Sequence, residues 1–231
     1  MRTTWVKRAI GAALGVVVVV ILGTWVYIEL IRGDVPERLS LDEHGEQRSG
    51  ASTATTNAGG LNGRWRVGPG SEAGYRVKEI LFGQDAEAVG RTKDVTGEID
   101  IVGTTVRSGS FSVAMATMVS DEARRDNQFR GRIMDVRSHP TATFRLTRPI
   151  EVPSVPPDGQ KLTVGATGDL TLRGTTKNVT IMLTAERLGG SIRIAGSLPI
   201  VFEEWGIPNP SFGPAQTEDR GELEFLLVLS R

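Results

Sequence analysis

The sequence predicts an all-β fold, an antiparallel barrel with one short helix, which follows a single membrane-spanning helix. From residue 64 onward, apolar and polar residues alternate in short segments, as is typical of half-buried strands. Gly, Pro, Asp or Asn bound these segments and suit tight turns. The alternation predicts about eight to ten strands. Closing them into a barrel would remove exposed sheet edges.

The predicted strands carry apolar residues at every second position. Hairpin turns are expected at residues 173–176 and 188–191, where glycines allow positive φ angles. A short helix is expected after the N-cap candidates Ser120 and Asp121, with Phe129 and Ile133 on one face. The apolar sets of the strands are Tyr75 and Val77; Ile99 and Ile101; Phe111, Val113 and Met115; Ala142, Phe144 and Leu146; Val164, Ala166, Leu170 and Leu172; Val179, Ile181 and Leu183; Ile192, Ile194, Leu198, Ile200 and Phe202; and Leu223, Phe225, Leu227 and Leu229.

Residues 9–28 form an uncharged, apolar run. At ~1.5 Å per residue, such a helix measures about 30 Å, the thickness of the hydrocarbon core of a bilayer. Basic residues precede the run, so the positive-inside preference places residues 1–8 in the cytoplasm and the remainder outside. The expectation is a single-pass cell-membrane protein. A cleaved signal peptide is the alternative, and it would leave a secreted or periplasmic protein.

Residues 29–63 are expected to form a flexible linker, because most of them are polar or small and show no apolar periodicity. His44 lies in this linker without neighbouring ligand residues and is assigned no function. The domains are therefore residues 1–8, 9–28, 29–63 and 64–231, the last being the barrel.

Composition excludes several classes of function. Lys and Arg together number 27, as do Asp and Glu, so the net charge gives no electrostatic basis for binding nucleic acid. The chain has no cysteine, which excludes disulfides, thiolate metal sites and thiol nucleophiles. No metal and no cofactor are expected, because His139 is the only histidine of the barrel and the carboxylates show no ligand spacing.

Two stretches of the predicted barrel carry a family signature. RDNQF (125–129), MDV (134–136) and HPTATF (139–144) follow one another, and TGDLTLRGTTKNV (167–179) forms the second stretch. With this spacing the chain resembles the YceI-like family over about residues 61–231. The resemblance implies a lipocalin-like antiparallel barrel of about eight strands, whose members are associated with polyisoprenoids or other long-chain amphiphiles.

The sequence departs from the family pattern at its histidines. The early family motif has become GSEAGYRVKE (70–79), which keeps Ser71 and the aromatic-Val pair but has no histidine. The histidine of the RD-x-H-L run is Gln128 here. The chain therefore lacks the histidines that could contact a head group at those positions, while the apolar interior is not affected.

Catalysis is not expected. His139 precedes a proline, which favours an extended backbone and a role in a turn. Glu203 and Glu204 are adjacent, so on a strand they would point to opposite faces and could not flank one bond. The loop at 203–214 combines aromatics with prolines and forms either a rim or lid of the cavity or a loop packed over one barrel end.

The preferred function is non-catalytic binding, storage or transport of a long-chain isoprenoid or acyl lipid by a membrane-tethered extracytoplasmic barrel. A cell-surface interaction barrel without a ligand cavity ranks second and a hydrolase third. Arg125 and Asp126 are possible contacts to a lipid head group, although a structural ion pair is the alternative. The oligomeric state is left open. The residues predicted to contact the lipid are Phe111, Met115, Phe144, Leu170, Leu172, Ile181, Phe202 and Trp205.

Overall fold

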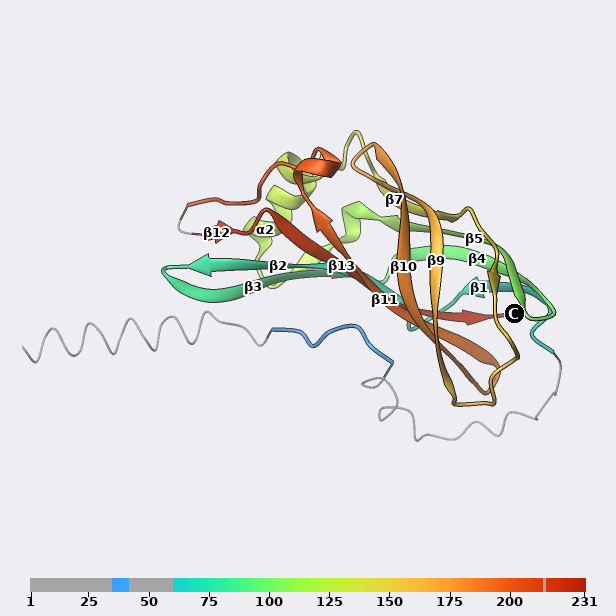
Figure 1. The fold of residues 1–231 in the computed structure, drawn as a ribbon. Helices are drawn as coiled ribbons and strands as arrows, with labels where there is room; N and C mark the ends of the chain where they lie inside the picture. Colours follow the sequence, from blue (N-terminus) through green and yellow to red (C-terminus); the bar gives the residue numbers. More distant parts are fainter. Residues whose placement is uncertain (1–34, 42–59, 214) are drawn as a thin grey trace, which may run out of the picture. The chain divides into compact units, whose positions relative to one another are not determined.

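The computed structural model describes residues 35–41, 60–213 and 215–231 (Figure 1). The chain divides into two compact units, Met1–Pro36 and Glu37–Arg231, and the barrel belongs to the second. The predicted membrane-spanning segment and His44 lie outside the described residues. Within the part of the chain that the structure describes, no helix has the length and apolar character needed to cross a bilayer.

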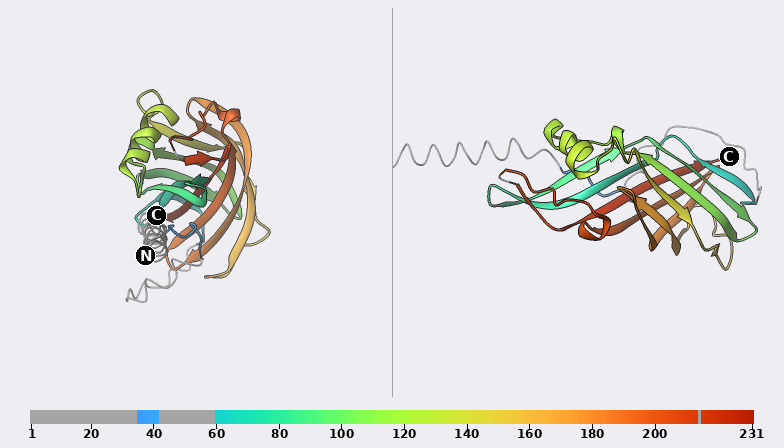
Figure 2. Two further views of the ribbon diagram at one scale, coloured as in Figure 1. Left: turned by 90° about the vertical axis from the view of Figure 1, so that its left-hand side faces the viewer. Right: turned by 90° about the horizontal axis from the view of Figure 1, so that it is seen from above.

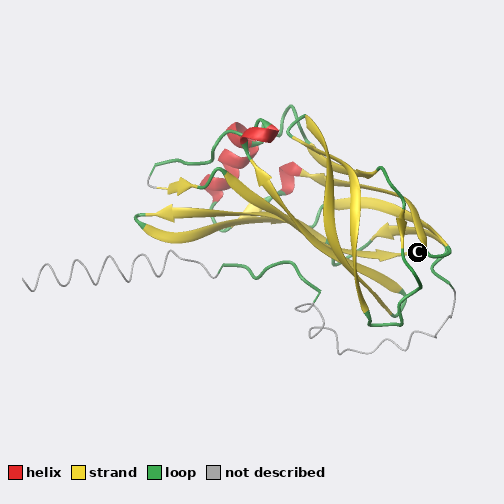
Figure 3. Cartoon of the chain, in the orientation of Figure 1, coloured by secondary structure: helices red, strands yellow, loops and turns green. Residues whose placement is uncertain are grey.

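The described chain is dominated by antiparallel strands (Figure 3). They are β1 (Gly63–Val67), β2 (Glu72–Leu81), β3 (Gln84–Thr92), β4 (Val95–Val102), β5 (Thr105–Ala114), β6 (Val119–Ser120), β7 (Thr141–Leu146), β8 (Ile150–Glu151), β9 (Lys161–Leu172), β10 (Thr175–Leu188), β11 (Ser191–Val201), β12 (Ala215–Thr217) and β13 (Arg220–Ser230).

Eight strands close into a barrel, which confirms the predicted all-β antiparallel barrel. The order around the ring is β1-β4-β5-β7-β9-β10-β11-β13, and pairing of β13 with β1 closes it. In the chain, β2 follows β1 and β3 precedes β4. Strands β2 and β3 pair with each other and form a long hairpin that extends beyond the ring (Figure 1). Strand β13 pairs with both β1 and β2, at Arg66↔Ser230 and at Glu222↔Arg76.

The break between β1 and β2 is bridged by the buried side chain of Ser71. Its Oγ accepts a hydrogen bond from the backbone N of Val228 at 2.9 Å and donates to the carbonyl of Gly68 at 2.8 Å. The hydroxyl therefore replaces ladder hydrogen bonds where the strand bends, and the buried backbone groups there remain satisfied.

One short helix covers the side of the barrel, as predicted (Figure 2). It consists of α2 (Ala123–Gln128), which continues as a π-helical turn over Phe129–Ile133. Phe129 and Ile133 are both buried, as their spacing predicted. The predicted N-caps were wrong, because Glu122 caps the helix by accepting from the backbone N of Arg124.

The interior contains two buried apolar clusters. One cluster includes Phe129, Leu170 and Trp205, and a second includes Trp65, Ile194 and Leu229. The second cluster consists of residues at the alternating inward positions of strands, whereas most buried members of the first lie in the helical turns and loops. The two clusters together form the core of the barrel.

The 37–41 segment packs against the outside of the barrel, which differs from the expected flexible linker. Leu39 and Leu41 are buried and contact Ala195 and Leu226, whose side chains point outward from β11 and β13. Two leucines in a polar stretch give no periodic signal, which explains why the sequence did not reveal this contact.

Candidate functional site

The candidate site is the apolar surface inside the barrel between the two buried clusters. Val113 packs against both clusters, so it lies between them. The residues around Val113 occupy the inward-facing alternate positions of their strands, but part of the surface of each side chain is accessible to solvent. An inward side chain that stays accessible indicates that the middle of the barrel is less completely filled than its buried clusters. These partly buried residues are Tyr75, Phe111, Val113, Phe144, Leu183, Leu198, Leu223 and Phe225.

The aromatic rings of this inner surface lie over glycines of neighbouring strands. A Cβ atom on Gly90 would lie 2.3 Å from Cε1 of Tyr75, so no larger residue fits beneath that ring. This close approach keeps each ring against the barrel wall. The other pairs, with the closest ring distance from the glycine Cβ position, are Phe111 on Gly97 (2.6 Å), Phe144 on Gly168 (2.5 Å) and Phe225 on Gly196 (2.8 Å).

The structure groups most of the predicted lipid-contacting residues in one place. Five of them, Met115, Leu170, Leu172, Phe202 and Trp205, belong to the same buried cluster, and Phe144 packs against it. Phe111 instead packs against the other cluster. Ile181 is buried on β10, where it pairs with Ala166 of β9.

Six further residues of the inner surface were not among the predicted contacts, namely Tyr75, Val113, Leu183, Leu198, Leu223 and Phe225. The sequence showed that these residues occupy alternate positions of their strands. How much of each side chain is accessible to solvent depends instead on which residues of the paired strands are small. Phe225 lies over Gly196 because β11 pairs with β13 at these residues. Only the register between strands supplies that information.

The loop that begins at η4 (Glu203–Trp205) packs over one end of the barrel. Trp205 is buried, and its carbonyl accepts a hydrogen bond from Oγ1 of Thr175 at 3.2 Å. Nζ of Lys177 lies 5.4 Å from the centroid of the Trp205 ring and binds Glu204 at 2.8 Å. These contacts fix the loop on the β9–β10 hairpin, as expected for a loop that closes this end.

Arg125 and Asp126 both have protein partners. The buried carboxylate of Asp126 accepts hydrogen bonds from the backbone N of Ser120 at 2.8 Å and from its Oγ at 2.7 Å. Arg125 binds Asp121 and lies 3.4 Å from Glu79. The geometry therefore accounts for both residues as structural contacts, and a role in head-group binding stays a prediction.

Tyr75 places a polar group at the edge of the inner surface. Its ring stacks on Phe129, with 5.0 Å between ring centroids and 11° between ring planes. Burial raises the pKa of the Tyr75 phenol; nearby Arg125 lowers it and Asp126 raises it further. The phenol is therefore neutral at physiological pH and can donate a hydrogen bond.

The histidine of the barrel is engaged in packing, and the described acidic residues form no metal-binding group. His139 lies against the β9–β10 turn, where a Cβ on Gly174 would be 2.6 Å from its Cε1. Within residues 35–41, 60–213 and 215–231, no three His, Cys, Asp or Glu side chains are grouped to hold a metal ion.

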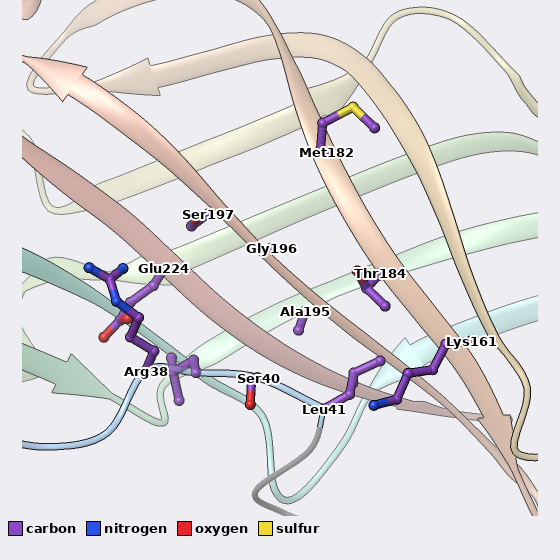
Figure 4. Close-up of a pocket in the computed structure, with 11 residues that line it drawn as sticks. Arg38, Ser40, Leu41, Lys161, Met182, Thr184, Ala195, Gly196, Ser197 and Glu224 are labelled. Atoms are coloured by element: carbon purple, nitrogen blue, oxygen red, sulfur yellow. The ribbon is translucent and has the colours of Figure 1, made fainter.

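A separate concave region lies outside the barrel, beside the 37–41 segment (Figure 4). Its volume is about 330 Å³, and its lining mixes Leu39, Leu41 and Met182 with the charged Lys161 and Glu224. Glu224 is 2% exposed and accepts from Arg91 at 2.9 Å and Arg76 at 3.4 Å. An apolar tail fits the inner surface better, because this outer region contains charged groups.

The model of the YceI-like domain matches residues 65–229. The chain belongs to this family. The YceI-like assignment confirms the resemblance that the two sequence signatures indicated, and it covers the whole closed barrel.

Two solved structures share the YceI-like fold. A polyisoprenoid-binding domain from Saccharophagus degradans is 13% identical, with a TM-score of 0.59 over 73% of this chain and 98% of the other. Burkholderia cenocepacia BcnA is 21% identical, with a TM-score of 0.51 over 67% of this chain and 95% of the other. At these identities the likeness establishes the fold alone. No curated protein matches the sequence.

The aromatic-on-glycine contact can be tested on β9. We expect Gly168→Ala to destabilise the barrel by about 1–3 kcal/mol, because its Cβ would meet the Phe144 ring and the carbonyl of Arg145 at 2.4 Å. Gly165→Ala on the same strand is the control, since its nearest contact is an ordinary 3.4 Å. Urea unfolding measures both variants. Equal stabilities would show that the glycine is not required for space.

The docking of the 37–41 segment should depend on pH. Burial raises the pKa of Glu222, but hydrogen bonds from Arg38 and Ser197 outweigh it, so the net pKa is lowered from 4.5. The stabilisation is therefore present above pH 4.5 and disappears as the pH falls through the lowered value. The hydrogen-exchange protection factors of residues 37–41, which are corrected for the intrinsic pH dependence of amide exchange, should fall on acidification. In Glu222→Gln we expect low protection factors already at neutral pH, and unchanged protection would contradict the ion-pair interpretation.

Proposed function

We propose that this protein binds and sequesters a long-chain isoprenoid or acyl lipid, with the tail along the inner surface of the barrel. The observation that carries the proposal is the set of inward aromatic and aliphatic side chains that remain partly accessible between two buried clusters. Membership of the YceI-like family and the polyisoprenoid-binding description of the Saccharophagus degradans domain support the same ligand class.

Burial of the tail would supply most of the affinity. At ~0.8 kcal/mol per carbon, one five-carbon isoprene unit contributes a gross ~4 kcal/mol, so a few units exceed the usual cost of association. The histidines of the family motifs are absent, and Asp126 is engaged by Ser120. Because few polar side chains are free to bind a head group at these positions, we expect the ligand to be held mainly by its tail.

We further propose that the barrel acts outside the cytoplasm, tethered by residues 9–28. The apolar run and the basic residues before it support this topology. We expect the full-length protein to sediment with membranes and to retain its N-terminus on sequencing. A soluble protein whose N-terminus begins near Ser49 would contradict the tether and support cleavage of a signal peptide.

Lipid binding is tested by native mass spectrometry of the detergent-purified full chain, followed by extraction and identification of co-purified lipid. We expect one prenyl or acyl lipid per barrel. In Val113→Phe, which fills the region between the clusters, we expect retention to fall roughly tenfold, the factor given by ~1.4 kcal/mol.

The matched control is Ser110→Phe, because Ser110 lies on the same strand but is exposed on the outside of the barrel. Lipid retention should be unchanged in this variant. A wild-type barrel that contains no lipid and takes none up from prenyl or acyl micelles would refute the proposal. That result would favour an interaction barrel filled by its own side chains.

A further inference from the structure

The turn of the β2–β3 hairpin exposes an aromatic side chain in an unusual place. Phe82 is 63% exposed, the largest exposure of any large hydrophobic side chain in the described ranges. It lies at the end of the hairpin that extends beyond the ring (Figure 1). Since Leu81 pairs with Gln84, Phe82 and Gly83 form the two-residue turn itself.

The backbone conformation of this turn favours a different residue. Phe82 and Gly83 have φ angles of 51° and 80°, and two consecutive positive φ angles are typical of a type I′ turn. Asn or Gly is preferred at the first position, because a Cβ-bearing bulky side chain is strained there. The β9–β10 turn has the same φ pattern, at 45° and 78°, with the polar residue Arg173 at the first position. Phe82 is thus both conformationally costly and exposed.

Neighbouring residues extend this exposed apolar surface. Strand β12 pairs with the end of β2, at Leu81↔Ala215, and Phe212 bridges to Ala215. Phe212 is 47% exposed, and Ile80 on β2 is 44% exposed. We call Ile80, Phe82 and Phe212 the tip patch. The guanidinium of Arg124 lies 4.8 Å from the centre of the Phe212 ring, which places a cation beside these side chains.

We propose that the tip patch inserts into the interfacial region of a lipid bilayer and docks this end of the barrel on the membrane. Aromatic side chains beside an arginine suit the boundary between head groups and acyl chains, where rings are buried and the cation stays near phosphates. The inference rests on the proposed function in two respects, because a membrane is the phase that contains the proposed ligand and residues 9–28 are the proposed tether.

The length of the chain favours a membrane over another partner. Eight residues separate Ile28, the end of the predicted membrane segment, from Glu37. The Glu37 carbonyl is bound by Arg91 and, at 3.3 Å, by Arg76 of β2. Eight extended residues reach at most ~29 Å. From Arg76, six residues along β2 lead to Phe82, a distance of ~20 Å. The fixed 37–41 segment therefore shortens the tether enough to keep the tip patch within reach of a bilayer.

Because the chain has no cysteine, a single introduced cysteine can be labelled at a chosen position. A single Gln84→Cys probe beside the turn is labelled with an environment-sensitive fluorophore. The full chain is reconstituted into vesicles of phosphatidylcholine and phosphatidylglycerol that carry nitroxide-labelled acyl chains. The control probe is Leu188→Cys at the β10–β11 hairpin, which the strand register places toward the other end of β13 and which is also exposed.

We expect blue-shifted, strongly quenched emission from the Gln84→Cys probe and none of this at the control probe. Phe82→Asn combined with Phe212→Ser should lower the ratio of docked to undocked protein at least about tenfold, as calculated from the quenching of the probe. Asn suits the turn, so this variant should fold at least as well as the parent. Leu188→Asn, in the Gln84→Cys background, should leave the quenching unchanged.

Equal quenching at the two probes, or quenching that survives the tip variant, would overturn the inference. Shielding of the Gln84→Cys probe without quenching, together with a doubled mass by light scattering, would overturn it in favour of a protein contact. The lipid content of the same preparation reports separately on the proposed function. A lipid-free barrel with a quenched tip would refute lipid binding and support docking.

Discussion

Pairing of β13 with two successive strands is the interaction on which the rest of the structure depends. Its final residues pair with β1 and close the ring, while Glu222–Leu226 pair with β2. One strand can serve both only because the chain bends between them, where Ser71 supplies the missing hydrogen bonds. The bend directs β2 and β3 out of the ring as a hairpin. Closure of the barrel and projection of the hairpin thus have the same structural origin.

The closed ring also determines what its interior can hold. An eight-stranded barrel has just enough internal width for its own side chains or for one small ligand. Here four inward rings lie over glycines at the wall, which moves their bulk away from the barrel axis. Large side chains are meanwhile concentrated in two clusters. The proposed binding of a tail rests on this division of volume and does not require a shortage of apolar residues.

The sequence predicted those features that depend on local periodicity. Strand alternation identified the apolar set of each strand but not which face lines a cavity, and the i, i+4 spacing of Phe129 and Ile133 identified the buried face of the helix. Family signatures added the barrel topology. The N-cap was misassigned because Ser120, a good capping residue, is instead held by the carboxylate of Asp126. Local preference was overridden by a contact six residues away.

Features that depend on register or on a few long-range contacts could not be predicted. The pairs Tyr75–Gly90 and Phe225–Gly196 need the alignment of two strands, which alternation alone leaves free. The 37–41 segment needs the outward residues Arg76, Arg193 and Leu226, which lie far along the chain. Taken alone, the polar sequence around its two leucines is typical of a linker.

The docked segment changes the physical meaning of the linker. A coil of some thirty residues would let the barrel take many positions, with an end-to-end distance of roughly 30 Å. Because residues 37–41 are fixed on the barrel, the predicted linker is divided into two parts. Only the part before Glu37 then separates the barrel from the predicted membrane segment, residues 9–28. The buried carboxylate of Glu224 supports this arrangement, because Arg76 and Arg91 bind both Glu224 and the Glu37 carbonyl. Buried charges are costly unless they are paired, so the network and the segment stabilise one another, and neither is expected to persist unchanged without the other.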